Sequence, residues 1–188
     1  MNLAHNLVCS SGWWARSVER ELLPWGLRNV ELGDDVLEIG PGFGATSRVL
    51  VKRPGRLSIL ELEPRYCERL RRDLGERADV YEGDATEMPF EGGRFSAVVC
   101  FTMLHHVPSP ELQDRLLSEA RRVLRPGGVF AGTDSRDRGF LFRMIHVGDT
   151  LVLVDPAGFP ARLAAAGFEE PRVDGAERSF KFSARKPA

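Results

Sequence analysis

The chain alternates between short apolar runs and longer segments in which apolar residues recur at helical spacing. The apolar runs have the length of buried strands and fall at residues 36–39, 56–62, 78–82, 95–101 and 129–133. The run from Phe95 to Phe101 is apolar on both faces, as expected of a central strand in a parallel sheet. Strands that alternate with helices in this way predict βαβ units and an α/β fold, with helices on both faces of the sheet.

Proline, glycine and capping residues mark the ends of the predicted helices. Pro64 stands at the first position of one helix, where its missing N–H costs nothing. Ser109 is a capping residue before Pro110 and opens another helix, which we expect Gly127 and Gly128 to end. These signals place the helices between the apolar runs.

An apolar stripe predicts a helix near the N-terminus, over residues 11–25. The stripe consists of Trp14, Val18, Leu22 and Trp25. We therefore expect Trp14 to lie in the core. Trp13 lies about 100° around the helix from the stripe, where it either caps the sheet or lines a pocket.

The C-terminal third changes in style. Residues 138–154 form a mixed segment with several aromatic residues. A helix that opens at Asp155 or at Pro160 runs to about residue 166, and Gly167 ends it. Two strand-like pieces, 170–173 and 180–184, are close enough in sequence to pair antiparallel.

The composition favours one globular domain with a small partner. The 188 residues suffice for a full hydrophobic core, and a second substrate domain would hardly fit. A formal net charge of −1 gives no overall attraction to phosphate backbones, which argues against nucleic acid as the partner.

Cysteine usage and hydropathy bear on the location of the chain. Cys9, Cys67 and Cys100 are odd in number and form no C-x-x-C pair, which argues against disulfides and favours a reducing, cytoplasmic setting. No run approaches the ~20 apolar residues of a membrane span. We therefore expect neither export nor a membrane partner.

The segment VLEIGPGFG predicts a strand that leads into a tight glycine loop. Glycine adopts positive φ and lets backbone amides approach a nucleotide or nucleoside closely. Gly40, Gly42 and Ala45 fit the dinucleotide fingerprint G-x-G-x-x-A, and Glu61 has the spacing of its ribose ligand. The same loop fits E-x-G-x-G-x-G, in which Glu38 lies inside the strand.

Ligands of an open α/β sheet bind at the carboxyl ends of the strands. The residues at these ends are 40–44, Glu61, Asp84 and Phe101. A carboxylate accepts well from two ribose hydroxyls, which suits Glu61, and an adenine amino group needs an acceptor such as Asp84. Leu62, Ala85 and Phe101 are apolar and are expected to sandwich the ring. In the alternative, Glu61 is a solvent-facing strand end and Asp84 caps a turn.

Four segments in register carry a family resemblance. VLEIGPGFG, EGDATEMPF, RFSAVVCFTMLHHV and RRVLRPGG cover most of residues 36–135. Their order and spacing resemble those of class I S-adenosylmethionine-dependent methyltransferases of the Methyltransf_11-like type. The resemblance implies S-adenosylmethionine as the cofactor. It assigns the methionine end to Glu38, Gly40, Pro41 and Gly42, the ribose to Glu61, and the adenine to Asp84 and Ala85.

The resemblance also implies the architecture of the whole chain. We expect a Rossmann-like, seven-stranded, mostly parallel sheet with helices on both faces and a C-terminal antiparallel hairpin. The single domain, 1–188, then divides into an N-terminal helical cap (1–33), a cofactor-binding core (34–135), and a substrate insert with the hairpin (136–188).

Two adjacent histidines are the candidates for acid–base chemistry. A histidine within reach of an acceptor hydroxyl or amine removes its proton as the methyl group moves, and we assign this role to His106. Helix capping and packing are the alternative. We expect the substrate to contact His105, Trp13 and Phe142, between the N-terminal helix and the insert. His5 and His146 have no partners at metal-ligand spacing in the sequence, so we expect no metal.

The leading hypothesis is in-line methyl transfer to an oxygen or nitrogen of a small molecule. An NAD-binding Rossmann-type protein, a binding protein without catalysis and an RNA methyltransferase are the alternatives. The NAD alternative has no obvious residues for hydride transfer. Tryptophan fluorescence titration with adenosylhomocysteine against NAD separates the leading hypothesis from the NAD alternative.

Overall fold

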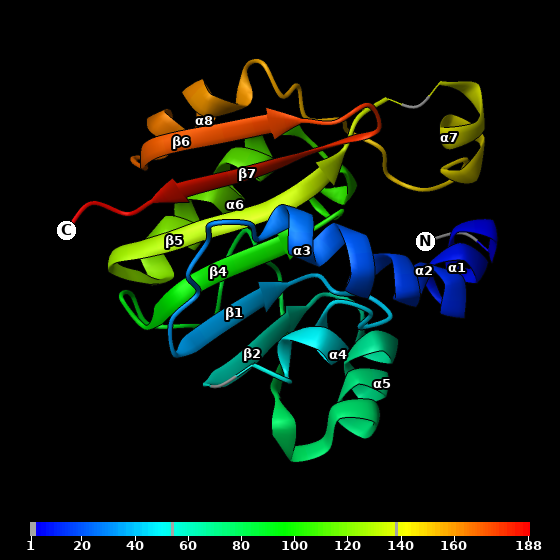
Figure 1. Cartoon of the computed structure of the whole chain (residues 1–188), viewed down its shortest axis with the longest axis horizontal. Helices are drawn as coiled ribbons and strands as arrows, with labels where there is room; N and C mark the ends of the chain where they lie inside the picture. Colours follow the sequence, from blue (N-terminus) through cyan, green and yellow to red (C-terminus); the bar gives the residue numbers. More distant parts are fainter. Residues whose placement is uncertain (1–2, 54, 138) are drawn as a thin grey trace.

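The computed structural model describes residues 3–53, 55–137 and 139–188, and the strands in these ranges form one seven-stranded sheet (Figure 1). They are β1 (Asp35–Ile39), β2 (Arg56–Glu61), β3 (Asp79–Glu82), β4 (Phe95–Phe101), β5 (Leu124–Ser135), β6 (Glu169–Gly175) and β7 (Ser179–Arg185), in the order β3-β2-β1-β4-β5-β7-β6. The first five pair in parallel, and β7 runs antiparallel between β5 and β6. The predicted fold class is confirmed.

Helices cover both faces of the sheet. They are α1 (Leu3–Cys9), α2 (Gly12–Ser17), α3 (Leu23–Gly26), α4 (Ser47–Leu50), α5 (Pro64–Leu74), α6 (Pro110–Val123), α7 (Phe140–Ile145) and α8 (Phe159–Ala165). One core lies between the sheet and α6 with α8, and includes Phe95, Phe130, Leu116 and Phe159. The other lies under α3, α4 and α5 and includes Leu23, Leu50, Ile59 and Leu70.

Most of the predicted element boundaries agree with the structure. Strand β4 has the predicted bounds, and α5 begins at Pro64. The Ser109 hydroxyl accepts a hydrogen bond from the Leu112 amide at 3.2 Å and so caps α6. The last helix begins at Phe159, within one residue of the later of the two predicted openings.

The predicted N-terminal helix contains a π-helical turn, Val18–Leu22, between α2 and α3. The amide of Leu23 donates to the carbonyl of Val18, five residues back. Pro24 has no N–H and cannot donate to the carbonyl of Arg20, which favours the wider turn. The inserted residue rotates α3 relative to α2, so Leu23 rather than Leu22 is the buried leucine.

The helix that was expected to end at Gly127 and Gly128 ends at Val123 instead. Leu124 is already extended, with φ −71° and ψ 144°, and begins β5. Pro126 disfavours helical backbone at the residue before it, which explains the early end. The pairing of β5 with β4 then shifts in register, so residues 125–128 bulge out of the strand.

The strand order reverses between β1 and β4, which opens a crevice at the carboxyl ends of these strands. In Figure 1, α1, α2 and α7 lie at this end of the sheet. The hydroxyl of Tyr66 in α5 donates to Asn6 in α1 at 2.8 Å. The amide of Val152 donates to the carbonyl of His105 at 2.8 Å. Within the described ranges, no helix has the length and apolarity needed to cross a bilayer.

Candidate active site

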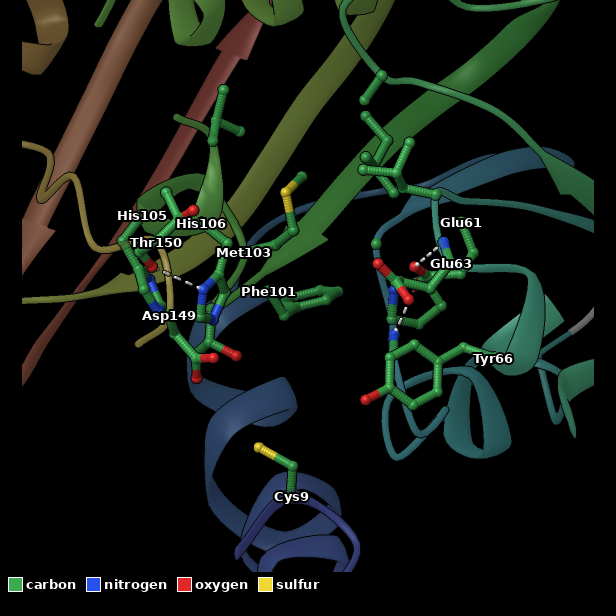
Figure 2. Close-up of a pocket in the computed structure, with 18 of the residues that line it drawn as sticks. Cys9, Glu61, Glu63, Tyr66, Phe101, Met103, His105, His106, Asp149 and Thr150 are labelled. Carbon is green, nitrogen blue, oxygen red and sulfur yellow. Dashed lines mark hydrogen bonds between the residues drawn. The ribbon is translucent and has the colours of Figure 1, made fainter. Parts of the chain in front are cut away.

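A cavity of about 590 Å³ occupies the crevice, a size typical of small-molecule sites. Its walls come from the glycine loop, the ends of β2, β3 and β4, the N-terminal helices and the segment around α7. The predicted site residues that line it are Gly40, Pro41, Gly42, Glu61, Leu62, Asp84, Ala85, Phe101, His105, His106 and Phe142. Figure 2 shows Glu61 and Tyr66 on one side and the two adjacent histidines on the other, with Phe101 between them.

The loop after β1 requires glycine for both backbone and space. Gly40 and Gly42 have φ of 60° and 55°, in the left-handed region that side chains disfavour. A Cβ on Gly40 would lie 2.5 Å from the Cγ of Met103. The loop backbone therefore lies directly against the cavity, with no side chain at these positions.

Glu61 is fixed by the backbone at the end of β2. Its Oε2 accepts from the amide of Gly42 at 2.9 Å, and its Oε1 accepts from the amide of Glu63 at 3.1 Å. Burial raises the pKa of this carboxyl, and the hydrogen bonds from the two amides oppose the rise. The carboxylate is held at the cavity wall.

Glu38, which the resemblance assigns to the methionine end of the cofactor, is not among the residues that line the cavity. The side chain is buried beneath the loop, where its oxygens accept hydrogen bonds from the hydroxyls of Thr46 and Ser47, the latter at 2.6 Å. Burial raises the pKa of Glu38 to about 7. A strand residue between apolar neighbours needs such partners, and Glu38 finds them at the start of α4. Its role is to anchor the loop.

The residues predicted to hold a nucleoside base come from the ends of β2, β3 and β4 and line the same cavity. Asp84 is exposed, and its Oδ1 accepts from the amide of Thr86 at 2.7 Å, so it caps a turn. Phe101 is buried at the end of β4, and Leu62 is 61% exposed. The high exposure of Leu62 shows that this end of the cavity opens to solvent.

A wall of histidines forms the opposite side. His105 is buried, and its Nδ1 is hydrogen-bonded to the carboxylate of Asp134, which is also fully buried. The Nδ1 of His106 lies 3.2 Å from the carbonyl oxygen of Thr150. The Nδ1 of His146 lies 2.7 Å from the carbonyl oxygen of Phe142. No sequence pattern placed His146 here, yet the fold brings it beside the other two. The side chain of His5 is outside the described part.

The N-terminal helices line the cavity with a different tryptophan from the one predicted. Trp13 is 64% exposed and is not part of the lining, whereas Trp14 is half-buried and lines the cavity. Trp14 also packs against the core under α3. The apolar stripe correctly predicts that Trp14 faces the core. Because the core ends where the cavity begins, the Trp14 ring both packs against the core and lines the cavity.

A family model described as a methyltransferase domain matches residues 36–128. This range holds the glycine loop, Glu61, Asp84 and the two adjacent histidines. The chain belongs to the class I S-adenosylmethionine-dependent methyltransferases.

Relatives with related names match parts of the chain. The fatty-acid O-methyltransferase of Mycolicibacterium smegmatis is 36% identical over 111 residues, which are 56% of this chain and 39% of that protein. Ribosomal RNA small subunit methyltransferase A of Cupriavidus taiwanensis is 43% identical over 61 residues, 32% of this chain and 22% of that protein. The chain thus spans about two fifths or less of these two relatives.

Solved structures share the fold at low sequence identity. The PH0226 protein from Pyrococcus horikoshii OT3 superposes with a TM-score of 0.79 at 18% identity, covering 92% of both chains. This similarity extends well beyond residues 36–128 and includes most of the C-terminal third.

The cavity suits S-adenosylmethionine, the cofactor of this family. Its described lining includes four acids, Glu61, Glu63, Asp84 and Asp149, and no lysine or arginine. The cofactor carries positive charge on its sulfur and its amine, which acidic walls favour. The glycine loop supplies backbone without side chains, and Glu61 supplies an acceptor for hydroxyls.

Several residues that line or support the cavity of this family member were not singled out from the sequence. Asp134 lies near the end of β5, one strand beyond the four strand ends considered, and that position was the available signal. His146 and Asp149 come from the irregular segment around α7, where periodicity carries no information about placement. Tyr66 reaches the cavity from α5. The apolar spacing of this helix indicates only that one of its faces is buried.

Proposed function

We propose that the protein transfers a methyl group from S-adenosylmethionine to an oxygen or nitrogen of a small, uncharged or cationic molecule. The proposed acceptor enters beside His105, His106 and Phe142, across the cavity from Glu61. When bound, S-adenosylmethionine supplies an electrophilic methyl group on a positively charged sulfur.

The charge of the cavity carries this proposal. Acidic residues line it, and the described lining holds no lysine or arginine to pair with a phosphate or a carboxylate. A polyanionic acceptor would meet like charge at short range, which costs free energy when water is excluded. An uncharged or cationic acceptor avoids this cost.

The proposed roles of the cofactor-facing residues follow from their positions. Glu61 exchanges its hydrogen bond from the Gly42 amide for bonds from ribose hydroxyls, and Asp84 accepts from the adenine amino group. Phe101 and Leu62 contact the faces of the base. The loop backbone at Gly40 faces the methionine end.

The acceptor-facing residues position the nucleophile and handle its proton. Holding the acceptor in line with the methyl carbon supplies most of the acceleration that such a reaction needs. The base predicted from the sequence, His106, lines the cavity and stays a proposal. His105 is a second candidate for the general base, because the carboxylate of Asp134 is hydrogen-bonded to its Nδ1 and fixes the orientation of the ring.

Two measurements test the proposal. Calorimetry on the purified full chain should detect adenosylhomocysteine binding at one site per chain, and NAD should not bind. A methyl-transfer assay on a panel of phenols, amines, fatty acids and an RNA fragment should show turnover on phenols or amines. Binding of NAD in place of adenosylhomocysteine, or turnover of RNA alone, contradicts the proposal.

Ribosomal RNA is the second candidate acceptor, favoured by the 61-residue match to ribosomal RNA small subunit methyltransferase A. A second hollow beside the cavity is lined by three arginines, Arg65, Arg69 and Arg72. A phosphate backbone could lie there while a base enters the cavity. The RNA arm of the assay decides between the two candidates.

A further inference from the structure

Three histidines from two separate segments meet at one wall of the cavity. His105 and His106 lie in a 3₁₀ turn, Leu104–His106, directly after β4, and His146 follows α7. The ring centroids are 4.2 Å apart for His105 and His106, 5.5 Å for His105 and His146, and 5.6 Å for His106 and His146. One nitrogen from each ring lies within 4.8 Å of the others.

The three rings share one orientation of their hydrogen bonds. In each, Nδ1 faces an oxygen: the carboxylate of Asp134, the carbonyl of Thr150 or the carbonyl of Phe142. A carbonyl or carboxylate oxygen only accepts, so Nδ1 carries the proton, and in the neutral ring the lone pair lies on Nε2. This is the arrangement by which proteins fix histidine ligands of a metal.

Asp134 is itself locked in place. Its Oδ2 accepts from the amide of His105 at 3.0 Å, and its Oδ1 accepts from the amide of Ser135 at 2.7 Å, in addition to the His105 ring. The carboxylate is fully buried at the end of β5. It therefore fixes the ring of His105 and adds negative charge behind it.

The geometry lies within reach of a tetrahedral metal site. Zinc–nitrogen bonds of ~2.0–2.1 Å in tetrahedral geometry require ligand nitrogens about 3.4 Å apart. The ring nitrogens lie within 4.8 Å of one another, so the rings must approach by about 1.4 Å to bind a tetrahedral ion. His106 is only half-buried. Asp149 lines the same cavity (Figure 2), and the described lining has no lysine or arginine to repel a cation.

We propose that His105, His106 and His146 bind one divalent cation with the ligand preference of Zn²⁺, and that its open coordination position faces the acceptor. Three imidazoles with one position left for another ligand are typical of catalytic rather than structural zinc. The inference deepens the proposed function, on which its role in acceptor binding rests. A cation there would hold an acceptor hydroxyl through its oxygen, opposite Glu61, and the coordinated His105 and His106 would then not act as bases.

The test is cation binding by the tag-free full chain after treatment with a chelator. Co²⁺ should bind at one equivalent and give visible absorption bands of a tetrahedral site, and Zn²⁺ should displace it. His146→Ala should weaken Zn²⁺ binding at least about 100-fold, and Asp134→Asn by about 10-fold to 100-fold, the range found for partners of ligands. Met144→Ala, at a 50% exposed position of α7, is the control and should bind Zn²⁺ as the parent does.

Adenosylhomocysteine binding separates the two proposals. The His146→Ala and Asp134→Asn variants should bind it like the parent, which also shows that they are folded. Absence of one-equivalent uptake, or equal uptake by the parent and His146→Ala, means an adventitious ion only and overturns the metal site; the histidines then act as bases. A parent that binds Zn²⁺ but not adenosylhomocysteine would contradict the proposed function instead.

Discussion

The two sides of the cavity are built in different ways. The side with Glu61 comes from the glycine loop and the ends of β1, β2 and β3, all within residues 38–86, and its key contacts join Glu61 to backbone amides. The side with the histidines joins the end of β4, the end of β5 and the segment around α7. Two of its contacts join residues far apart along the chain, His105 to the carboxylate of Asp134 and His106 to the carbonyl of Thr150, while His146 contacts the carbonyl of Phe142 four residues back.

This difference separates what a local motif specifies from what the fold assembles. A loop that must adopt positive φ demands glycine, so its residue types are readable wherever it occurs. A ring held by a carboxylate 29 residues away leaves no comparable local pattern. We therefore expect changes on the first side to act through cofactor binding and stability, and changes on the second to act on the acceptor.

The largest expected effect concerns Glu38, which anchors the glycine loop. Its folded pKa of about 7 lies above the unfolded value of 4.5, so the folded state holds the proton more tightly. The proton on Glu38 therefore stabilises the folded state fully below pH 4.5, and this stabilisation is lost as the pH rises through 7. The free energy of unfolding of Glu38→Gln minus that of the parent should therefore rise by about 3 kcal/mol from pH 4.5 to pH 8. Urea denaturation across this range measures it.

Glu119→Gln is the matched control. The hydrogen bond from Arg122 lowers the pKa of Glu119 below 4.5, so this carboxyl stays ionised in both states between pH 5 and 8. The difference in unfolding free energy between this variant and the parent should be constant over that window. Parallel curves for Glu38→Gln as well would show that Glu38 does not hold a proton at neutral pH.

Glu61→Gln tests the cofactor side directly. Replacing one acceptor oxygen with an amide should weaken adenosylhomocysteine binding about 100-fold, because hydrogen bonds to a charged group contribute about 1.5–3 kcal/mol each. Glu82→Gln is the control, since Glu82 pairs with Glu61 in the neighbouring strand but lies outside the cavity. Calorimetry gives both affinities. Equal affinities for the two variants would remove Glu61 from the ribose site.

Phe142→Ala tests the acceptor side. Phe142 is buried beside His146, with ring centroids 4.4 Å apart, and lines the cavity. Losing its ring should raise the KM for the best acceptor of the panel about 10-fold, a cost of about 1.4 kcal/mol, and leave adenosylhomocysteine binding unchanged. Met144→Ala in the same helix should change neither. A loss of cofactor affinity in Phe142→Ala would mean that the two sides are not separable.

The sequence was sufficient for most of the sheet, for identifiable physical reasons. Strand β4 is uniformly apolar, and Pro64 and Ser109 mark helix starts by chemistry that acts within one turn. The π-helical turn at residues 18–22 escaped prediction because Leu22 and Leu23 are both apolar, so the sequence does not show which of them is buried. The start of β5 was missed because Pro126 ends the helix before the glycines do.

The cofactor side was also predictable, whereas the acceptor side was predictable only in part: His105, His106 and Phe142 line the cavity as expected, but His146 and Asp134 were not singled out. Strand-end residues such as Glu61 and Asp84 follow from the topology of a parallel sheet, which brings all carboxyl ends together. Glu38 was expected at the cofactor but lies outside the lining, because a buried carboxylate is satisfied equally by a ligand or by nearby hydroxyls, and the sequence does not distinguish these. His146 needed the path of the segment around α7, which no periodicity encodes.

The smallest expected effect concerns two neighbouring tryptophans, Trp13 and Trp14. The apolar stripe predicts which of them is buried but not which of them contacts a ligand. Trp14→Ala removes a half-buried ring that both packs on the core and lines the cavity, and should lower the free energy of unfolding by about 1 kcal/mol. Trp13→Ala, at an exposed position, should change it by less than about 0.5 kcal/mol. Because only Trp14 lines the cavity, quenching of tryptophan fluorescence by adenosylhomocysteine should largely persist in Trp13→Ala and fall in Trp14→Ala. The reverse result would mean that the opposite face of the N-terminal helices, which carries Trp13, lies toward the ligand. Trp14 would then not form this wall of the cavity.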